Sequence, residues 1–231
     1  MIHNGKSRKL PFDPAEALAH LRASDPKLGV LIDKVGEFKL RLDPAPSPFE
    51  SLLESILYQQ LHGKAAAAIL KRLLTFFGEL HPAPQHLLDA PEDRLRGCGL
   101  SGSKLLALRD LAAKTLDGTV PTMPRIRRMS DAEIIERLTQ VRGIGPWTVE
   151  MLLIFRLGRP DVLPVDDYGV RKGFALTFQG LKPSDKVTPA LLPKPDVMRR
   201  RGQRWKPWSS VASWYLWRAC DLAAGKLAPL A

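Results

Sequence analysis

Apolar residues recur along this chain with the three- and four-residue spacing of amphipathic helices, and the apolar–polar alternation typical of strands is almost absent. The pattern predicts about ten helices and no internal repeat. We therefore expect an all-α fold. The segments predicted to be helical lie at 15–41 with a break at Asp25-Pro26, 49–61, 63–78, 101–118, 130–140, 146–158, 166–178 and 208–225, with one short helix and the start of another in 80–97.

Several helix starts carry their own signals. Ser130 and Glu133 have the spacing of a capping box. Either Ser101 or Ser103 is a suitable cap for the helix that follows. Pro146 stands where a helix would have its first residue, a position at which the missing N–H costs nothing.

A glycine-rich turn separates two of the helical segments, in the stretch VRGIGPWTVEML at 141–152. Gly143 and Gly145 can adopt φ values that other residues resist, and they present no side chain to an approaching surface. The turn also delivers a helix N-terminus, whose first amides lack internal partners and attract anions such as a nucleic-acid phosphate. The amides expected to be available are those of Gly145, Trp147 and Thr148. The alternative is a plain connection in an αα-hairpin.

Composition narrows the class of protein. The 231 residues suffice for one large domain or two small lobes. Lys and Arg number 35 against 24 Asp and Glu, a net charge of +11, which favours a polyanionic partner, most often nucleic acid. No apolar run has transmembrane length and no secretory signal is evident, so we expect a cytoplasmic protein with no membrane partner. Two cysteines and five scattered histidines predict no iron–sulfur cluster and no zinc site.

Five blocks of sequence share a likeness to one group of enzymes. They are ILYQQLHGKAAAAI, GLSGSKLLALRDLA, LTQVRGIGPWTVEMLLIF, PDVLPVDDYGVRKG and WKPWSSVASWYLWR. Together, and in this order, they resemble the helix–hairpin–helix DNA glycosylases of base-excision repair, in particular the 3-methyladenine-DNA glycosylase II family. The resemblance implies two helical lobes, 1–48 plus 166–231 and 49–165, with DNA bound in the cleft between them. The N-terminal β domain of some relatives is expected to be missing.

The resemblance also implies an activity: excision of flipped-out alkylated purines, such as 3-methyladenine and 7-methylguanine, from double-stranded DNA. The family's catalytic carboxylate corresponds to Asp167, with Asp166 as the alternative, and we expect the other aspartate of this pair to cap the following helix. A carboxylate stabilises the positive charge that builds on the sugar. Relatives that also cut the strand carry a lysine where this chain has Trp147, so we expect a monofunctional enzyme that leaves an abasic site.

Further residues take roles by the same resemblance. Flipped bases are held by aromatic stacking, and Trp147 and Trp217 are expected to line that pocket, with Tyr168 and Tyr58 beside them. Trp205 and Trp208 are assigned to packing. Gln60, or alternatively Leu61, is expected to fill the gap left in the DNA. The residues expected to contact DNA are Gln60, Leu61, Gly143, Gly145, Trp147 and Thr148.

No cofactor is expected, apart from one monovalent cation at the hairpin, as in relatives. Its ligands would be the backbone carbonyls of Thr139, Val141 and Ile144. The arginine clusters at 125–128 and 199–204 are either DNA contacts or solvated faces. We expect the protein to act as a monomer.

Two other functions stay open at this level. One is a DNA-binding module that keeps the hairpin and has lost catalysis, although such a module needs neither the aspartate pair nor the aromatic cluster. The other is a glycosylase for a neutral lesion such as 8-oxoguanine or a mismatched pyrimidine.

Overall fold

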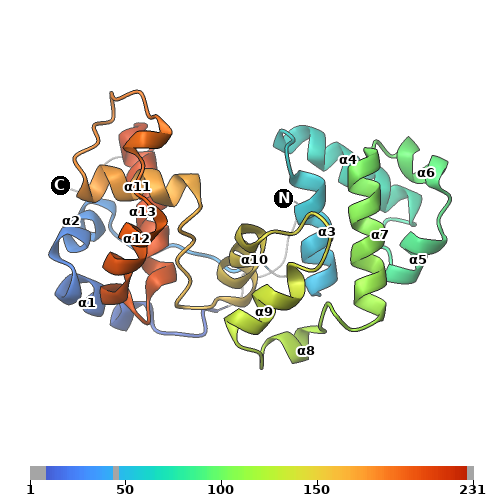
Figure 1. Ribbon diagram of the computed structural model, residues 1–231, viewed down its shortest axis with the longest axis horizontal. Helices are drawn as coiled ribbons and strands as arrows, with labels where there is room; N and C mark the ends of the chain where they lie inside the picture. Colours follow the sequence, from blue (N-terminus) through green and yellow to red (C-terminus); the bar gives the residue numbers. More distant parts are fainter. Residues whose placement is uncertain (1–8, 44–46, 228–231) are drawn as a thin grey trace. The chain divides into compact units, whose positions relative to one another are not determined.

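The computed structural model of the chain describes residues 9–43 and 47–227. Within these ranges it contains thirteen α-helices, short 3-10 and π-helical turns and no β-strand, which confirms the all-α prediction. The α-helices are α1 (Pro14–Ser24), α2 (Pro26–Val35), α3 (Pro48–Tyr58), α4 (Gly63–Phe76), α5 (Pro84–Asp89), α6 (Glu92–Gly97), α7 (Gly102–Leu116), α8 (Met123–Ile126), α9 (Asp131–Leu138), α10 (Pro146–Leu152), α11 (Tyr168–Phe178), α12 (Pro195–Gly202) and α13 (Ser209–Ala223) (Figure 1).

Local sequence accounts for where many of these helices begin. The Ser130 hydroxyl and the Glu133 carboxylate form the predicted capping box at the start of α9. Of the two candidate serines, Ser101 is the N-cap of α7 and accepts the Lys104 N–H at 3.3 Å. Asp25 ends α1 and caps α2, so the predicted break there is confirmed. α8 and α12 were not predicted, because each is short and lies in a proline-containing stretch.

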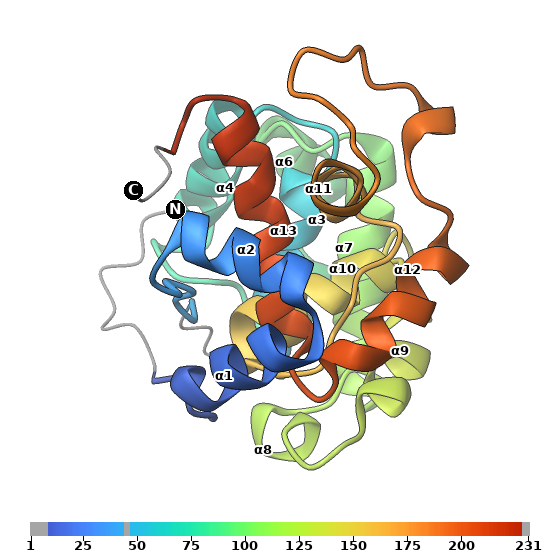
Figure 2. The ribbon, with the colours of Figure 1, turned by 90° about the vertical axis from the view of Figure 1, so that its left-hand side faces the viewer.

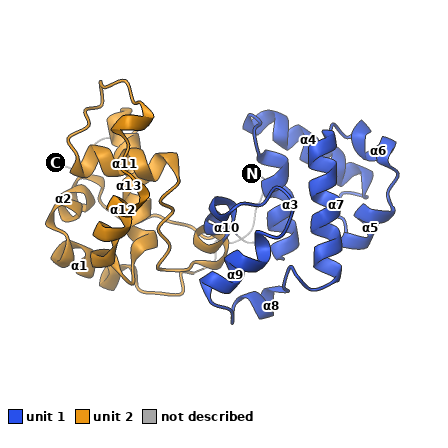
Figure 3. Cartoon of the chain, in the orientation of Figure 1, with its two compact units in different colours: residues 1–6, 43–152 blue, residues 7–42, 153–231 orange. Residues whose placement is uncertain are grey.

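The described chain forms two compact units (Figure 3). Unit 1 spans Asp43–Leu152 and contains α3 to α10. Unit 2 is built from two separate stretches, 9–42 and 153–227 of the described residues, and contains α1, α2 and α11 to α13. The lobe boundaries at 48/49 and 165/166 that the sequence suggested stay a prediction.

The core of unit 1 forms around α3 and α7, which pack together (Figure 1). Leu52, Leu53 and Leu57 of α3 are fully buried, as are Leu108 and Leu111 of α7. These positions recur at three- and four-residue intervals, so each helix turns one apolar stripe inward. The start of α7 is thereby fixed against the end of α3.

Unit 2 is organised around α13, against which α1, α2 and α11 pack (Figure 2). Every residue from Ser209 to Leu216 is buried, as expected of a helix enclosed on most sides. α11 approaches α13 very closely at Gly173, where an added Cβ would lie 1.9 Å from the Leu216 carbonyl oxygen. Only glycine allows that approach.

A buried ion pair ties α12 to the start of α2 within unit 2. Arg201 donates two hydrogen bonds, of 2.7 and 2.6 Å, to the fully buried Asp25, and the Trp205 indole N–H adds a third at 3.0 Å. Burial alone would raise the pKa of Asp25, but these donors outweigh it and lower the pKa. Arg201 therefore has a structural partner within unit 2, and the assignment of Trp205 to packing is confirmed.

None of the helices in the described part of the chain combines the length and the apolar character needed to cross a membrane.

Candidate functional site

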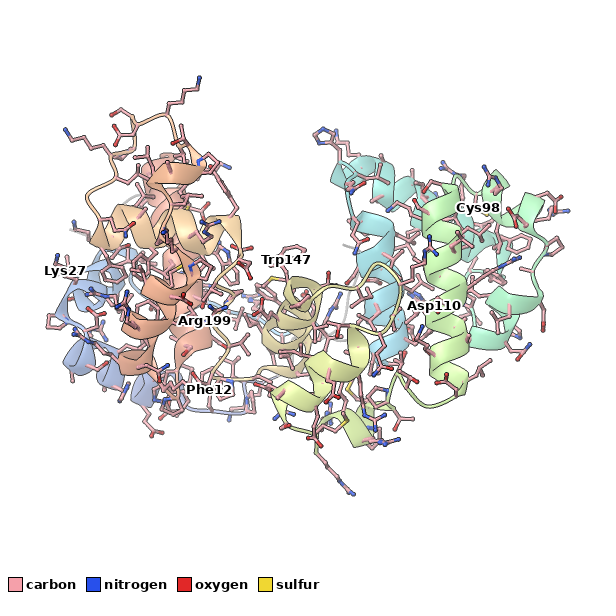
Figure 4. The ribbon with its side chains drawn as sticks, viewed as in Figure 1. Phe12, Lys27, Cys98, Asp110, Trp147 and Arg199 are labelled. Carbon is pink, nitrogen blue, oxygen red and sulfur yellow. The ribbon has the colours of Figure 1, made fainter. Side chains whose placement is uncertain are left out.

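The hairpin turn between α9 and α10 is held by a hydrogen bond within the turn and by another from α7. The Ile144 N–H donates to the Val141 carbonyl at 3.0 Å, and both side chains are buried. From α7, Asp110 accepts the Arg142 N–H at 2.7 Å (Figure 4). Burial raises the pKa of Asp110, but hydrogen bonds from Lys114 and from the Arg142 amide outweigh it and keep the carboxyl below its usual pKa. Asp110 is thus an ionised anchor for the hairpin.

The two glycines of the turn serve different purposes. Gly143 has a φ of +80°, in the left-handed region that favours glycine. Gly145 does not have a positive φ, so the expected conformational role is wrong for that residue, but a Cβ placed there meets no atom within 4 Å. Its backbone therefore lies open to an approaching surface.

The expectation for the amide of Thr148 is wrong. That N–H donates to the Gly145 carbonyl at 3.0 Å, closing the first turn of α10, and the Thr148 side chain is buried. The amide is already used inside the turn, because α10 begins immediately at Pro146. Contact between Thr148 and DNA stays a prediction.

The candidate gap-filling residues lie just beyond α3. The helix ends at Tyr58, which is half-buried, and Gln60 and Leu61 follow on the surface. Gln60 has a φ of +57°, an uncommon value for a residue with a side chain. The preceding residue, Gln59, donates from Nε2 to the carbonyl of Gly143 at 2.8 Å. Two segments that the sequence marks separately are therefore in direct contact within unit 1.

In unit 2, Asp167 is the N-cap of α11. One carboxylate oxygen accepts both the Val170 N–H at 2.7 Å and the Trp217 indole N–H at 2.8 Å. Asp166 is exposed. The residue of the pair that caps the helix is therefore Asp167, which is also the preferred candidate for the catalytic carboxylate. Which of the two carboxylates is catalytic stays a prediction. Two donors on one oxygen fix the orientation of the Asp167 carboxylate.

Trp217 is positioned for this contact by its neighbours. Its ring lies 5.5 Å from that of Phe155, centroid to centroid. A Cβ at Gly169 would lie 2.7 Å from the Trp217 ring and 3.2 Å from Asp167 Oδ1, so glycine leaves the room that the pair needs. The resemblance had given Trp217 only a stacking role, and its N–H donation to Asp167 is new.

The other aromatic candidates are accessible. Trp147 is 46% exposed on α10 (Figure 4), and Tyr168 is 59% exposed at the start of α11. Tyr58 and Trp147 belong to unit 1, while Tyr168 and Trp217 belong to unit 2. Their joint role in a base-binding pocket stays a prediction.

The cation proposed for the hairpin would use three backbone carbonyls of the turn. Of these, the Val141 carbonyl already accepts the Ile144 N–H, which leaves one of its two lone pairs. Thr139 and Ile144 flank it within the same turn, so oxygen donors suited to a hard cation are close in sequence. Within the ranges that the structure describes, no cluster of His, Cys, Asp or Glu could hold a metal ion. The cation site stays a proposal.

Comparison with known proteins places the chain in a family. The family model described as "HhH-GPD superfamily base excision DNA repair protein" matches residues 53–195. A Schizosaccharomyces pombe protein named DNA-3-methyladenine glycosylase 1 is 36% identical over 210 residues, which cover 90% of this chain and 88% of the relative.

Solved structures agree with this placement. The S. pombe 3-methyladenine DNA glycosylase in complex with abasic DNA has a TM-score of 0.73 at 35% identity, covering 88% of this chain and 95% of that one. A Bacillus halodurans DNA-3-methyladenine glycosidase has a TM-score of 0.80 at 30% identity, covering 95% and 94%. The chain belongs to the HhH-GPD superfamily of base-excision DNA repair proteins.

Proposed function

We propose that this protein is a monofunctional DNA N-glycosylase that flips alkylated purines out of double-stranded DNA and excises them, leaving an abasic site. Its substrates include 3-methyladenine and 7-methylguanine. The relatives named above are 3-methyladenine glycosylases by name, and they match nearly the whole chain. The observation that carries the proposal is the Asp167 carboxylate, held at the start of α11 by two N–H donors.

Asp167 acts through its negative charge. When the bond between C1′ and the base nitrogen breaks, the electron pair leaves with the base and positive charge develops on the sugar. A fixed carboxylate stabilises that charge and orients the attacking water. Water adds its oxygen to C1′ and loses a proton. A purine methylated at N3 or N7 is already cationic and departs as a neutral base, so no general acid is required.

Borohydride added during turnover should trap no covalent complex between this protein and DNA. A strand-cutting glycosylase attacks C1′ with an amine and forms a reducible imine, whereas Trp147 offers no such nucleophile and residues 140–158 contain no lysine. A labelled strand should stay intact until alkali is added. An adduct that survives denaturation and disappears on mutation of one lysine, such as Lys172, would contradict the monofunctional assignment.

Trp217→Phe should lower the single-turnover rate of base release about tenfold, since it removes one hydrogen bond to a charged group while keeping a ring against Phe155. The rate is measured on a duplex carrying one 7-methylguanine. Trp208→Phe is the matched control, because that ring packs on Phe12 in the same unit. Equal losses in the two variants would show that Trp217 only supports the fold.

Gly145→Asp should weaken binding to any duplex, damaged or intact. The substitution puts a negative side chain at a position that is open now and that we assign to a DNA phosphate. The slope of log affinity against log salt should shrink by about 0.9, as expected for one lost phosphate contact. Gly145→Ala, which adds bulk without charge, is the control. An unchanged slope with lower thermal stability would make the turn purely structural.

We further propose that the enzyme works as a monomer in the compartment that holds the DNA, which in a bacterium is the cytoplasm with its nucleoid. The net charge of +11 supports association with DNA. Light scattering after size exclusion should give the mass of one chain, 25.7 kDa.

A further inference from the structure

The turn that follows α3 holds an unfavourable backbone conformation. Gln60 lies in the left-handed region with a φ of +57°. Residues other than glycine persist there only when surrounding contacts impose it, and such positions cluster at functional sites. Gln60 is itself exposed, so its own side chain packing cannot supply the constraint. The residue before it, Gln59, makes contacts that hold the turn.

Lys104, in the first turn of α7, supplies one of these contacts. Its ammonium donates to the carbonyls of Ile56, Leu57 and Gln59 at 2.5, 2.8 and 3.0 Å. Three bonds use every N–H that a lysine carries. The acceptors are carbonyls at the end of α3, which lack helical partners and carry the negative end of the helix dipole.

The partly buried position of Lys104 disfavours the charged form of its side chain. Partial burial lowers the pKa of its ammonium below the usual value for lysine. A helix end alone can be closed by an ordinary C-cap residue without a half-buried lysine. Here the acceptors include Gln59, which directly precedes the strained residue.

Gln59 supplies the second contact. Its amide nitrogen donates to the Gly143 carbonyl at 2.8 Å, at the positive-φ position of the hairpin turn. The adjacent Arg142 amide is bound by Asp110 of α7. The turn after α3 and the hairpin turn are therefore fastened to each other and to α7 within unit 1.

We propose that Lys104 and Gln59 form a clamp that positions Gln60 and Leu61 for insertion into the DNA gap, in register with the hairpin that grips the backbone. The inference rests on the proposed function, because it assigns these residues to the base-flipping step. They are positioning residues and do not touch the reacting atoms. A rigid clamp lets DNA bound at the hairpin meet an already formed wedge, so little ordering remains to be done on flipping.

The test compares base release from two duplexes under single-turnover conditions. In one, a 7-methylguanine is paired with cytosine; in the other it is a single-nucleotide bulge, which leaves no gap when it flips. Lys104→Met and Gln59→Met remove the donors and keep unbranched stems. Each should lose about 10- to 100-fold on the paired lesion, as misplacement of a functional group does, and very little on the bulge. Lys71→Met, at an exposed lysine of α4, controls for the lost charge.

The outcomes distinguish a clamp that positions Gln60 and Leu61 from contacts that only stabilise the fold. An equal loss on both duplexes would mean that the clamp merely supports the fold, and no loss on either would remove its role. If Lys104→Met fails to fold, Gln59→Met alone decides, because its side chain is only half-buried and it changes one hydrogen bond. If the wild-type protein releases no base from either duplex, the proposed function fails, which is distinct from failure of the clamp.

Discussion

Asp167→Asn should retain binding to damaged DNA and lose base release by about 10²-fold or more, the effect of removing one electrostatic contribution of ~2.7–4 kcal/mol. The substitution isolates charge from geometry. An asparagine oxygen can still accept the Val170 N–H and the Trp217 N–H that now reach Asp167 Oδ1. Asparagine is also as good an N-cap as aspartate, so α11 should be unaffected.

Two further variants at Asp166 and Asp167 serve as controls for this experiment. Asp166→Asn removes the adjacent exposed carboxylate and should leave release near normal. Asp167→Ala should lose both activity and the cap of α11, the latter costing about 0.5–2 kcal/mol of stability. Loss of release in Asp166→Asn, with near-normal release in Asp167→Asn, would show that the other carboxylate is catalytic.

Gly173→Ala should produce the largest loss of stability of any alanine substitution at a described glycine. The added methyl group would lie 1.9 Å from the Leu216 carbonyl oxygen, a backbone atom that can move only if α11 and α13 separate. Overpacking in a core costs typically ~1–3 kcal/mol and occasionally more. Denaturant unfolding should therefore show a lowered midpoint or no folded protein.

Gly97→Ala is the matched control for that experiment. Gly97 ends α6, has no positive φ, and an added Cβ there meets no atom within 4 Å. The variant should match the wild type or gain slightly, since alanine loses less backbone entropy than glycine on folding. If the two variants have the same stability, the close approach of α11 and α13 is not what holds unit 2.

The helices were predictable because their signals are local. The capping box of Ser130 and Glu133 and the apolar stripes of α3 and α7 are all written within a few residues of sequence. The apolar spacing predicts one helix over 146–158, but the segment changes from α to π after Leu152. That change depends on packing in three dimensions, which periodicity does not report.

The site was predictable only in part, because several of its contacts join segments that are far apart in the sequence. The DD pair and the glycine turn mark Asp167 and Gly143 in the sequence, and the family resemblance gives them roles. The contacts between distant segments carry no local signal: Trp217 donates to Asp167 across 50 positions, Gln59 to Gly143 across 84 and Lys104 to Ile56 across 48. Nothing near Lys104 in the sequence shows that its ammonium binds the end of α3.

The capping of α11 by Asp167, the proposed catalytic residue, illustrates a further limit of prediction from sequence. The sequence predicts that one aspartate of the adjacent pair caps the helix and that the other is catalytic. In the structure one oxygen of Asp167 accepts both N–H donors, so the helix cap also orients the carboxylate. The arrangement gives this residue a rigid position, which electrostatic stabilisation of a transition state requires.

The most direct measurement is to incubate the protein with methylated duplex DNA and identify the released material by mass. The account predicts free 3-methyladenine and 7-methylguanine, intact strands until alkali is added, and loss of both products with Asp167→Asn. Tight binding of the same DNA without release of any base would contradict it and indicate a DNA-binding module in place of an enzyme.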